Sequence, residues 1–346
     1  MRKNTLSKLT FLLLVMALIL SMNVFIVNIA HAGKKEEAAP GKVPEEKPLV
    51  IGHVNIWNIG WYAYLGNAVD IIADKYGVEI ARLFTDYTVE KELQAVEDMI
   101  TRDVDGIILG STSADSCQRA AQLCNDADIP LVIENSSIAP GPGKVVSDVE
   151  FDWRLLGRMM AEETAKHWPG SRVVIITGVL GTGPIDLLLE DFNETAEKVG
   201  IEVVKIIPAD YMTEKALTET QNLIQSGLEF DVIWGNCQEM TEGIIEAFKS
   251  AGILGEKIIL STNGGPMDVK NLEEGELDGC INYSPGFHGL LCFLTMYNYL
   301  TGEEVPELTY LPMKWIDPEN LDEVFPWEMD ASFIPLAEQY METGSL

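Results

Sequence analysis

Residues 172–183 read RVVIITGVLGTG, a run of β-branched residues followed by a glycine-rich loop. The run Arg172–Thr177 is typical of a buried strand, and the glycines after it let the backbone turn close to a neighbouring segment. A comparable strand opens an earlier series at Leu49–Asn55. The stretch at 172 therefore indicates that the pattern begun at Leu49 starts a second time.

Further short β-branched runs are separated by longer stretches with helical spacing, such as Leu93, Val96, Met99 and Ile100. Strands that alternate with helices of this length predict βαβ units and parallel sheets. The remaining predicted strands are Val78–Phe84, Gly106–Gly110, Pro130–Glu134, Glu202–Ile207, Asp231–Gly235, Lys257–Ser261 and Gly279–Tyr283.

The alternation of strand and helix patterns is interrupted near Val146–Trp153 and begins again at Arg172. The repeated units are more than one doubly wound domain usually holds, so we expect an α/β protein of two Rossmann-like lobes. A single eight-stranded α/β barrel is the alternative. The restart with its own glycine loop, and a tail after Gly302 without helical spacing, favour two lobes.

The N-terminus predicts export. Arg2, Lys3 and Lys8 precede an apolar run that ends at Ala30-His31-Ala32, which is the order of a signal peptide cleaved after Ala32. A retained membrane anchor is the alternative. Residues 33–48 are charged and proline-rich and are expected to form a disordered linker. The expected location is the periplasm.

The formal net charge is −30 at pH 7, which argues against nucleic acid or an anionic membrane surface as a partner. The five cysteines show no metal-ligand spacing, and we expect buried free thiols, with a Cys237–Cys280 bridge left open.

Polar side chains follow several predicted strands. Because ligands of open α/β sheets bind beyond the carboxyl ends of the strands, these residues are candidates for a site, although each could also be a turn or helix-cap residue. They are Ser111, Asn135, Asp186, Asn236 and Asn263, with Tyr211 adding a ring.

The loop after the first strand, 55–64, reads NIWNIGWYAY. Flat rings suit the apolar face of a sugar or a cation, so Asn55, Trp57, Trp61 and Tyr62 are candidate ligand contacts. The alternative is that Trp61 and Tyr64 begin the next helix and pack in the core.

Catalytic motifs are missing from the sequence. It holds no G-x-S-x-G or H-E-x-x-H pattern, and the loop at 178–183 lacks the lysine of a phosphate-binding loop. We therefore expect a binding protein without a catalytic site, metal or cofactor, and keep an enzyme that uses scattered carboxylates as an alternative.

From Leu49 to about Gly302 the chain resembles the ribose- and galactose-type periplasmic binding proteins. The segments that carry the resemblance are 51–62, Asp105–Leu109, Ile129–Val132, Gly181-Thr182, Pro208–Tyr211, Glu239-Met240, and Gly275 with Gly279. The family implies two lobes that close over a ligand by a hinge, no catalysis, and delivery to a membrane permease. It adds Tyr283 to the candidate site.

The resemblance also implies where the chain divides. Three crossings are expected near 149–152, 283–285 and 303–310. They give an N-terminal lobe of 49–150 plus 284–306 and a C-terminal lobe of 151–283 plus 307–325. The apolar residues of the tail, such as Trp327 and Phe333, indicate that an extension at 326–346 packs on one lobe.

The chain departs from the family's sugar pattern at two places. Asn135-Ser136 stand where an Asp-Arg pair is usual, and Asp186 stands where an arginine is usual. A second, shorter likeness at Ile108–Thr112 and 151–157 is to a periplasmic sensor of trimethylamine N-oxide that partners a histidine kinase, and it adds Trp153 to the site. We expect a monomer that binds a carbohydrate-like ligand for an ABC uptake system, with an amine-oxide sensor as the alternative.

Overall fold

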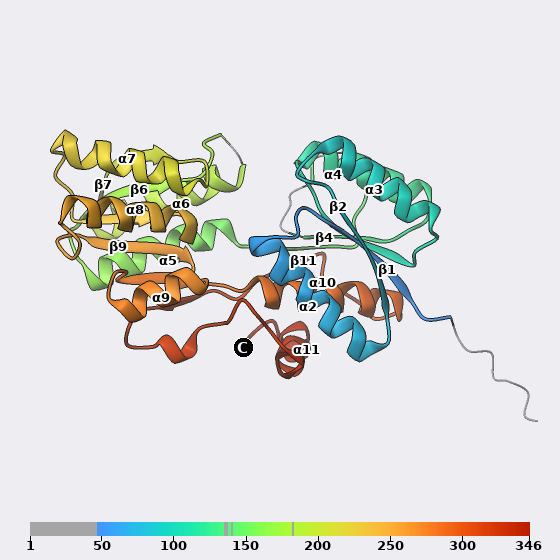
Figure 1. Cartoon of the computed structure of the whole chain (residues 1–346). Helices are drawn as coiled ribbons and strands as arrows, with labels where there is room; N and C mark the ends of the chain where they lie inside the picture. Colours follow the sequence, from blue (N-terminus) through green and yellow to red (C-terminus); the bar gives the residue numbers. More distant parts are fainter. Residues whose placement is uncertain (1–46, 135–137, 140, 182) are drawn as a thin grey trace, which may run out of the picture. The chain divides into compact units, whose positions relative to one another are not determined.

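Two sheets of six strands account for the β-branched runs (Figure 1). The computed structural model describes residues 47–346, with the exception of 135–137, 140 and 182. The N-terminal sheet is parallel throughout and has the order β11-β5-β4-β3-β1-β2. Its strands are β1 (Val50–Asn55), β2 (Glu79–Phe84), β3 (Gly106–Gly110), β4 (Leu131–Glu134), β5 (Ser147–Glu150) and β11 (Leu308–Tyr310).

The C-terminal sheet repeats this order as β12-β10-β9-β8-β6-β7, and only β12 runs antiparallel to its neighbour. Its strands are β6 (Arg172–Thr177), β7 (Glu202–Pro208), β8 (Val232–Gly235), β9 (Ile258–Asn263), β10 (Gly279–Asn282) and β12 (Lys314–Ile316). The predicted fold of two Rossmann-like lobes is therefore confirmed.

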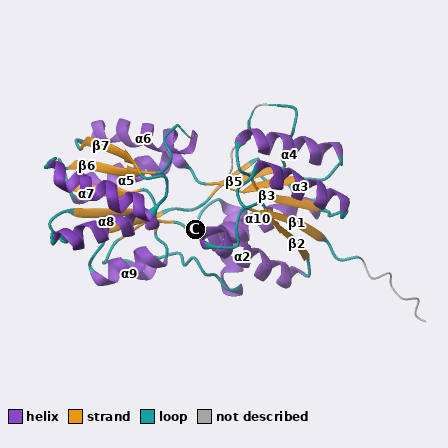
Figure 2. Ribbon diagram, turned by 45° about the horizontal axis from the view of Figure 1, so that its top comes forward, coloured by secondary structure: helices purple, strands orange, loops and turns teal. Residues whose placement is uncertain are grey.

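Both faces of the N-terminal sheet are covered by helices, as Figures 1 and 2 show. Side chains alternate between the faces of a strand, so Ile51 packs under α2 and α10 while Val54 packs under α3 and α4. The helices are α2 (Gly60–Tyr76), α3 (Val89–Thr101), α4 (Ala114–Asp126) and α10 (Pro285–Leu300). Burial on both faces explains why these strands are almost continuously apolar.

The C-terminal sheet is covered in the same way. Val173 and Ile175 face the pair α5–α6, and Val174 and Ile176 face α7 and α8. The helices are α5 (Trp153–His167), α6 (Gly183–Val199), α7 (Thr213–Ser226), α8 (Gln238–Ala251) and α9 (Pro266–Glu274). Helix α8 ends at Gly252 in the left-handed conformation that glycine adopts without a steric penalty.

The chain first passes between the two sheets at two short connections. Phe151-Asp152 joins β5 to α5, and Tyr283-Ser284 joins β10 to α10. The third lies later than the expected 303–310, because β11 pairs with β5 and so belongs to the N-terminal sheet. The chain passes to the C-terminal sheet between Tyr310 and Lys314. The segment 307–310, expected in the C-terminal lobe, thus lies in the other sheet.

A fourth passage follows β12. The chain runs through two short 3₁₀ turns, Leu321–Glu323 and Ala331–Phe333, into α11 (Ile334–Thr343). Helix α11 packs on α10, with Ile334 and Ala337 buried in the shared core. Glu338 accepts hydrogen bonds from Tyr76 at 2.6 Å and Lys75 at 3.1 Å. The extension therefore ends on the N-terminal lobe.

Residues 48–346 form one compact unit. The predicted signal peptide (1–32) and nearly all of the predicted linker (33–48) lie outside the described residues. Within the described part, no helix combines the length and apolar character needed to span a bilayer. All five cysteines are free and buried, so the bridge between Cys237 and Cys280 that the sequence left open is not formed.

Candidate ligand-binding site

Three neighbouring strands of the C-terminal sheet end in polar residues. Thr177 ends β6, Asn236 follows β8 and Asn263 ends β9. Because β6, β8 and β9 are adjacent and parallel, their carboxyl ends meet at one edge of the sheet. Two of the predicted site residues, Asn236 and Asn263, are therefore brought together, and Thr177 joins them.

Several buried polar atoms at these strand ends have no hydrogen-bond partner among the described residues. In the C-terminal lobe they are Oδ1 and Nδ2 of Asn236 and Oγ1 of Thr177, and in the N-terminal lobe they are Oδ1 of Asn55 and Oγ1 of Thr85. Leaving such a group unsatisfied costs about 1–3 kcal/mol, so each of these atoms calls for a ligand or an ordered water. They mark a polar site that the protein chain alone does not complete.

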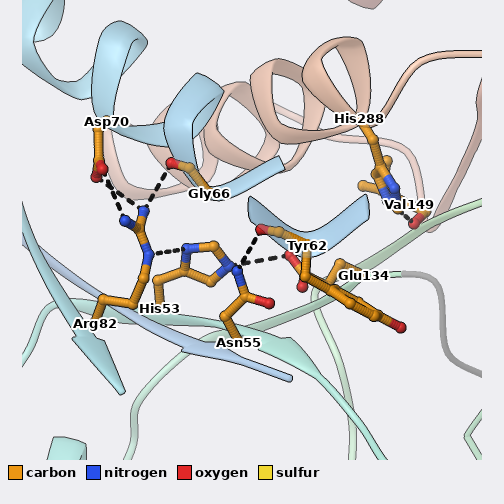
Figure 3. A network of polar contacts seen from close by, with 9 residues as sticks. All are labelled: His53, Asn55, Tyr62, Gly66, Asp70, Arg82, Glu134, Val149 and His288. Carbon is orange, nitrogen blue, oxygen red and sulfur yellow. Dashed lines mark hydrogen bonds and ion pairs between the residues drawn. The ribbon is translucent and has the colours of Figure 1, made fainter. Parts of the chain in front are cut away.

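Asn55 is held by the loop that follows it. Its Nδ2 donates to the Tyr62 carbonyl oxygen at 3.0 Å, which fixes the amide plane and leaves Oδ1 as the free acceptor (Figure 3). The first turn of α2 thus orients the side chain at the end of β1.

Trp57 and Tyr87 form an exposed aromatic platform on the N-terminal lobe. Their ring centroids lie 5.4 Å apart with an interplanar angle of 30°, and Tyr62 meets Trp57 edge-on at 6.0 Å. Trp57 is 39% exposed and Tyr87 is 52% exposed. Two stacked rings open to solvent offer a flat surface to the apolar face of a ring-shaped ligand.

Trp61 lies in a different environment, packed among rings from distant parts of the chain. Phe151 and Trp327 each lie 5.3 Å from it and Tyr283 lies 5.7 Å from it, all edge-on. Trp153 packs on Phe151 at 5.2 Å. The predicted residues Trp61, Trp153 and Tyr283 therefore share one aromatic cluster at the first two passages between the sheets. The Trp61 indole N–H is buried there without a partner among the described residues.

Tyr211 follows β7 and is 44% exposed, but its hydroxyl end packs on Gly178. A Cβ at position 178 would lie 2.2 Å from Cζ of Tyr211, so only glycine leaves room for this ring. Burial, and to a lesser extent the nearby Cys237 and Tyr87, raises the pKa of the Tyr211 phenol. The first glycine of the loop at 178–183 thus accommodates a tyrosine ring by close packing.

Both the oxygen and the nitrogen of the Asn263 side-chain amide form hydrogen bonds. Its Nδ2 donates to the Tyr283 hydroxyl at 3.2 Å, and its Oδ1 accepts from the backbone N–H of Gln238 at 3.4 Å. Its φ is +95°, a strained value for asparagine. Asn263 therefore connects the end of β9 to the start of α8 and to the second passage.

Two other predicted residues hydrogen-bond within their own lobe. The Ser111 hydroxyl donates to the buried carboxylate of Glu92 at 2.5 Å, and Glu92 also accepts from the Thr112 N–H at 2.7 Å. Asp186 is exposed in the first turn of α6, where Oδ1 accepts from the Gly181 N–H at 3.2 Å. Asn135 lies outside the described residues.

Beneath the strand ends of the N-terminal lobe lies a chain of charged and polar side chains (Figure 3). The Arg82 guanidinium donates to both oxygens of Asp70, at 2.7 and 2.8 Å, and through Nε to His53 Nδ1 at 3.0 Å. Because arginine can only donate, His53 Nδ1 must accept, which assigns the ring proton to Nε2. His53 Nε2 then donates to Glu134 Oε2 at 3.2 Å, and both side chains are fully buried.

Tyr87, Thr85 and Thr177 lie at these strand ends but were not predicted from the sequence as site residues. Tyr87 could have been found, because Asp86-Tyr87 repeats the Asp210-Tyr211 pair that follows the corresponding strand of the other lobe. Among the described residues, no group of three or more His, Cys, Asp or Glu side chains is arranged to hold a metal ion.

Several known proteins are similar to this chain in sequence. The model of the family described as periplasmic binding protein domain matches residues 54–304. The ribose import binding protein RbsB of Escherichia coli is 26% identical over 253 residues, which cover 73% of this chain and 84% of that protein. A putative rhizopine-binding protein of Rhizobium meliloti is 24% identical over 285 residues, covering 75% and 91%.

Solved structures of solute binding proteins have a similar fold. An ABC transporter solute binding protein from Bacillus halodurans with bound myo-inositol is 25% identical, has a TM-score of 0.74, and covers 81% of this chain and 98% of its own. A solute binding protein from Actinobacillus succinogenes with bound D-allose has the same TM-score at 18% identity, covering 80% and 99%, and supports the fold alone. With two six-stranded α/β lobes and a family match over most of its length, the chain belongs to the periplasmic binding protein domain family.

Proposed function

We propose that this protein binds a neutral sugar or cyclic polyol between its two lobes, delivers it to the permease of an ABC uptake system, and leaves it chemically unchanged. The observation that carries the proposal is the set of neutral, buried, unpartnered groups on Asn55, Thr177 and Asn236. They include both acceptors and donors. A ligand hydroxyl can donate and accept at once, so a polyhydroxylated ring satisfies them together.

The relatives and solved structures support this choice of ligand. Their names give ribose and myo-inositol, which are both small polyols without charge. A methylated amine oxide has one acceptor oxygen and no hydroxyl, so it leaves the free acceptors of Asn55 and Asn236 unsatisfied. The polar strand ends therefore favour the sugar over the amine-oxide sensor that the sequence left open.

Thermal denaturation with D-ribose, D-allose, myo-inositol and trimethylamine N-oxide tests the proposal. A ligand present at a hundred times its Kd stabilises the folded state by about 2.7 kcal/mol, which gives a clear rise in Tm. We expect a rise with at least one of the three polyols and none with the amine oxide. Mass spectrometry should recover the ligand unchanged. A rise with the amine oxide alone, or turnover of a polyol, would contradict the proposal.

Asn236→Ala sharpens the test, because it removes a buried amide that has no partner in the described chain. We expect it to weaken polyol binding at least tenfold while the Tm of the ligand-free protein holds or rises, since the unsatisfied group is gone. Asn125→Ala is the matched control. The Asn125 amide forms two hydrogen bonds with the backbone of Lys144 at the surface. The Asn125→Ala variant should therefore have a slightly lower Tm and unchanged ligand binding.

A further inference from the structure

The two lobes carry the same six-residue pattern at the same place. Residues 86–91 read DYTVEK and residues 210–215 read DYMTEK, so both match D-Y-x-x-E-K. The first follows β2 and leads into α3, and the second follows β7 and leads into α7. Strands β2 and β7 are the equivalent edge strands of the two sheets.

The two turns are also built alike. The Thr88 N–H donates to the Thr85 carbonyl at 3.1 Å, and the Met212 N–H donates to the Ala209 carbonyl at 2.9 Å. In each turn the lysine forms an ion pair with the aspartate five residues before it, Lys91 with Asp86 and Lys215 with Asp210. The repetition thus includes backbone and side-chain bonds as well as sequence.

Both turns hold a tyrosine in a strained backbone conformation. The φ angles are +50° and +58° for Asp86 and Tyr87, and +53° and +62° for Asp210 and Tyr211. Among the described residues, every other non-glycine position with positive φ is an aspartate or asparagine, which tolerate it better than a bulky ring does. Strain of this kind is concentrated at functional sites, where the conformation positions a side chain.

Packing does not explain the strain at Tyr87. The side chain is 52% exposed, so its burial contributes little to folding, and its main described ring contact is the stack on Trp57. Trp57 belongs to the loop after β1, next to Asn55 with its unpartnered Oδ1. Tyr87 thus extends an aromatic surface beside an incomplete polar site.

We propose that Tyr87 contacts the ligand and determines specificity in the N-terminal lobe, as the counterpart of Tyr211 in the C-terminal lobe. The stacked rings of Trp57 and Tyr87 accept the apolar C–H face of a sugar or polyol ring, while the strand-end amides bind its hydroxyls. The preferred ligand is therefore a pyranose or cyclitol with a continuous C–H face. This inference rests on the proposed function.

Isothermal titration calorimetry tests the role of Tyr87. The proteins are wild type, Tyr87→Ala, Tyr87→Phe and Tyr87→Gly, and the titrants are D-ribose, D-allose and myo-inositol. For each titrant that binds wild type, we expect Tyr87→Ala and Tyr87→Gly to weaken binding at least tenfold. Tyr87→Phe should stay within about threefold, because the stacking ring remains. Tyr299→Ala is the matched control, since Tyr299 is 45% exposed on α10, and it should bind like wild type.

The Tm of the ligand-free variants separates a binding role from a structural one. Glycine adopts positive φ without strain, so Tyr87→Gly should keep or raise the Tm even as binding is lost. A variant that loses Tm and affinity together would overturn the inference in favour of a structural turn. If wild type binds a titrant and Tyr87→Ala matches Tyr299→Ala, the inference fails and the proposed function stands. If wild type binds none of the three, both fail.

Discussion

The two lobes place very different side chains at one equivalent position. In the N-terminal lobe the register of β1 and β2 pairs His53 with Arg82, and in the C-terminal lobe the register of β6 and β7 pairs Ile175 with Ile206. His53 and Ile175 are both fully buried. The sheet order is the same around each pair. The architecture therefore does not require charge at this place, and the N-terminal lobe has a polar network where its counterpart has an apolar layer.

The two versions of this layer respond differently to mutation. An apolar layer loses only the contacts of the atoms removed. A buried polar network is a set of mutually dependent groups, and the loss of one member leaves the others desolvated and unpaired. A pair of substitutions, one in each lobe, tests this difference directly.

His53→Leu is expected to have the largest effect. It removes the donor to the buried Glu134 carboxylate and the acceptor for Arg82 Nε, so two charged groups each lose one hydrogen bond in a buried network. Breaking a buried pair in this way costs about 3–5 kcal/mol of unfolding free energy. Ile175→Val, the control in the other lobe, should cost about 0.5–1.5 kcal/mol. Urea unfolding followed by circular dichroism compares them, and equal losses would show that the network contributes no more than packing.

Asp148→Asn tests a pH dependence that arises at strand β5 of the N-terminal lobe. Burial, together with the nearby Glu150, raises the pKa of Asp148 to about 8. The corresponding strand β10 carries no carboxylate. Because the folded state binds this proton more tightly than the unfolded chain does, stability is greatest at low pH. It declines as the pH rises from about 4 towards 8.

We therefore expect the contribution of Asp148 to the unfolding free energy of wild type to be smaller at pH 8.5 than at pH 5. Asp148→Asn should remove about 4 kcal/mol of that difference, because asparagine stays neutral. Asp98→Asn, at an exposed position of α3, is the control and should leave the difference unchanged. Unfolding free energies at the two pH values decide the point. An unaltered difference in Asp148→Asn would mean that Asp148 ionises alike in both states.

Tyr340→Phe should have the smallest effect. Its hydroxyl donates to the Tyr310 carbonyl at 2.7 Å and helps to hold α11 on the N-terminal lobe. A single hydrogen bond of this kind contributes about 0.5–1.5 kcal/mol. Tyr299→Phe, which alters an exposed tyrosine of α10, should have no measurable effect on urea unfolding. A loss in Tyr340→Phe no greater than in the control would indicate that packing alone retains the helix.

The main strands could be predicted because their apolar pattern is local. Strands β3 and β6 begin and end at the predicted residues. Strand β5 was missed because its sequence, Ser-Asp-Val-Glu, carries two carboxylates, and it forms through pairing with β4 and β11. The three-residue strands β11 and β12 depend on the same kind of distant pairing.

The site was only partly predictable for a related reason. The polar ends of β1, β8 and β9 follow from the strand pattern, which places Asn55, Asn236 and Asn263 at the edges of their sheets. The sequence could not distinguish Trp57, which is exposed, from Trp61, which is packed. That difference comes from Phe151, Tyr283 and Trp327, which approach Trp61 from other parts of the chain.

The C-terminal extension changes how the protein would bear mechanical tension. Strand β1 begins the described fold in the N-terminal lobe, and α11 ends it on the same lobe. The C-terminal sheet is therefore inserted between two segments that belong to its neighbour. A force applied between Pro48 and Thr343 would act first on the contacts of α11 with α10 and on the Glu338 bonds to α2. Only after α11 detached would the load reach the C-terminal lobe, so that lobe would unfold second in a pulling experiment.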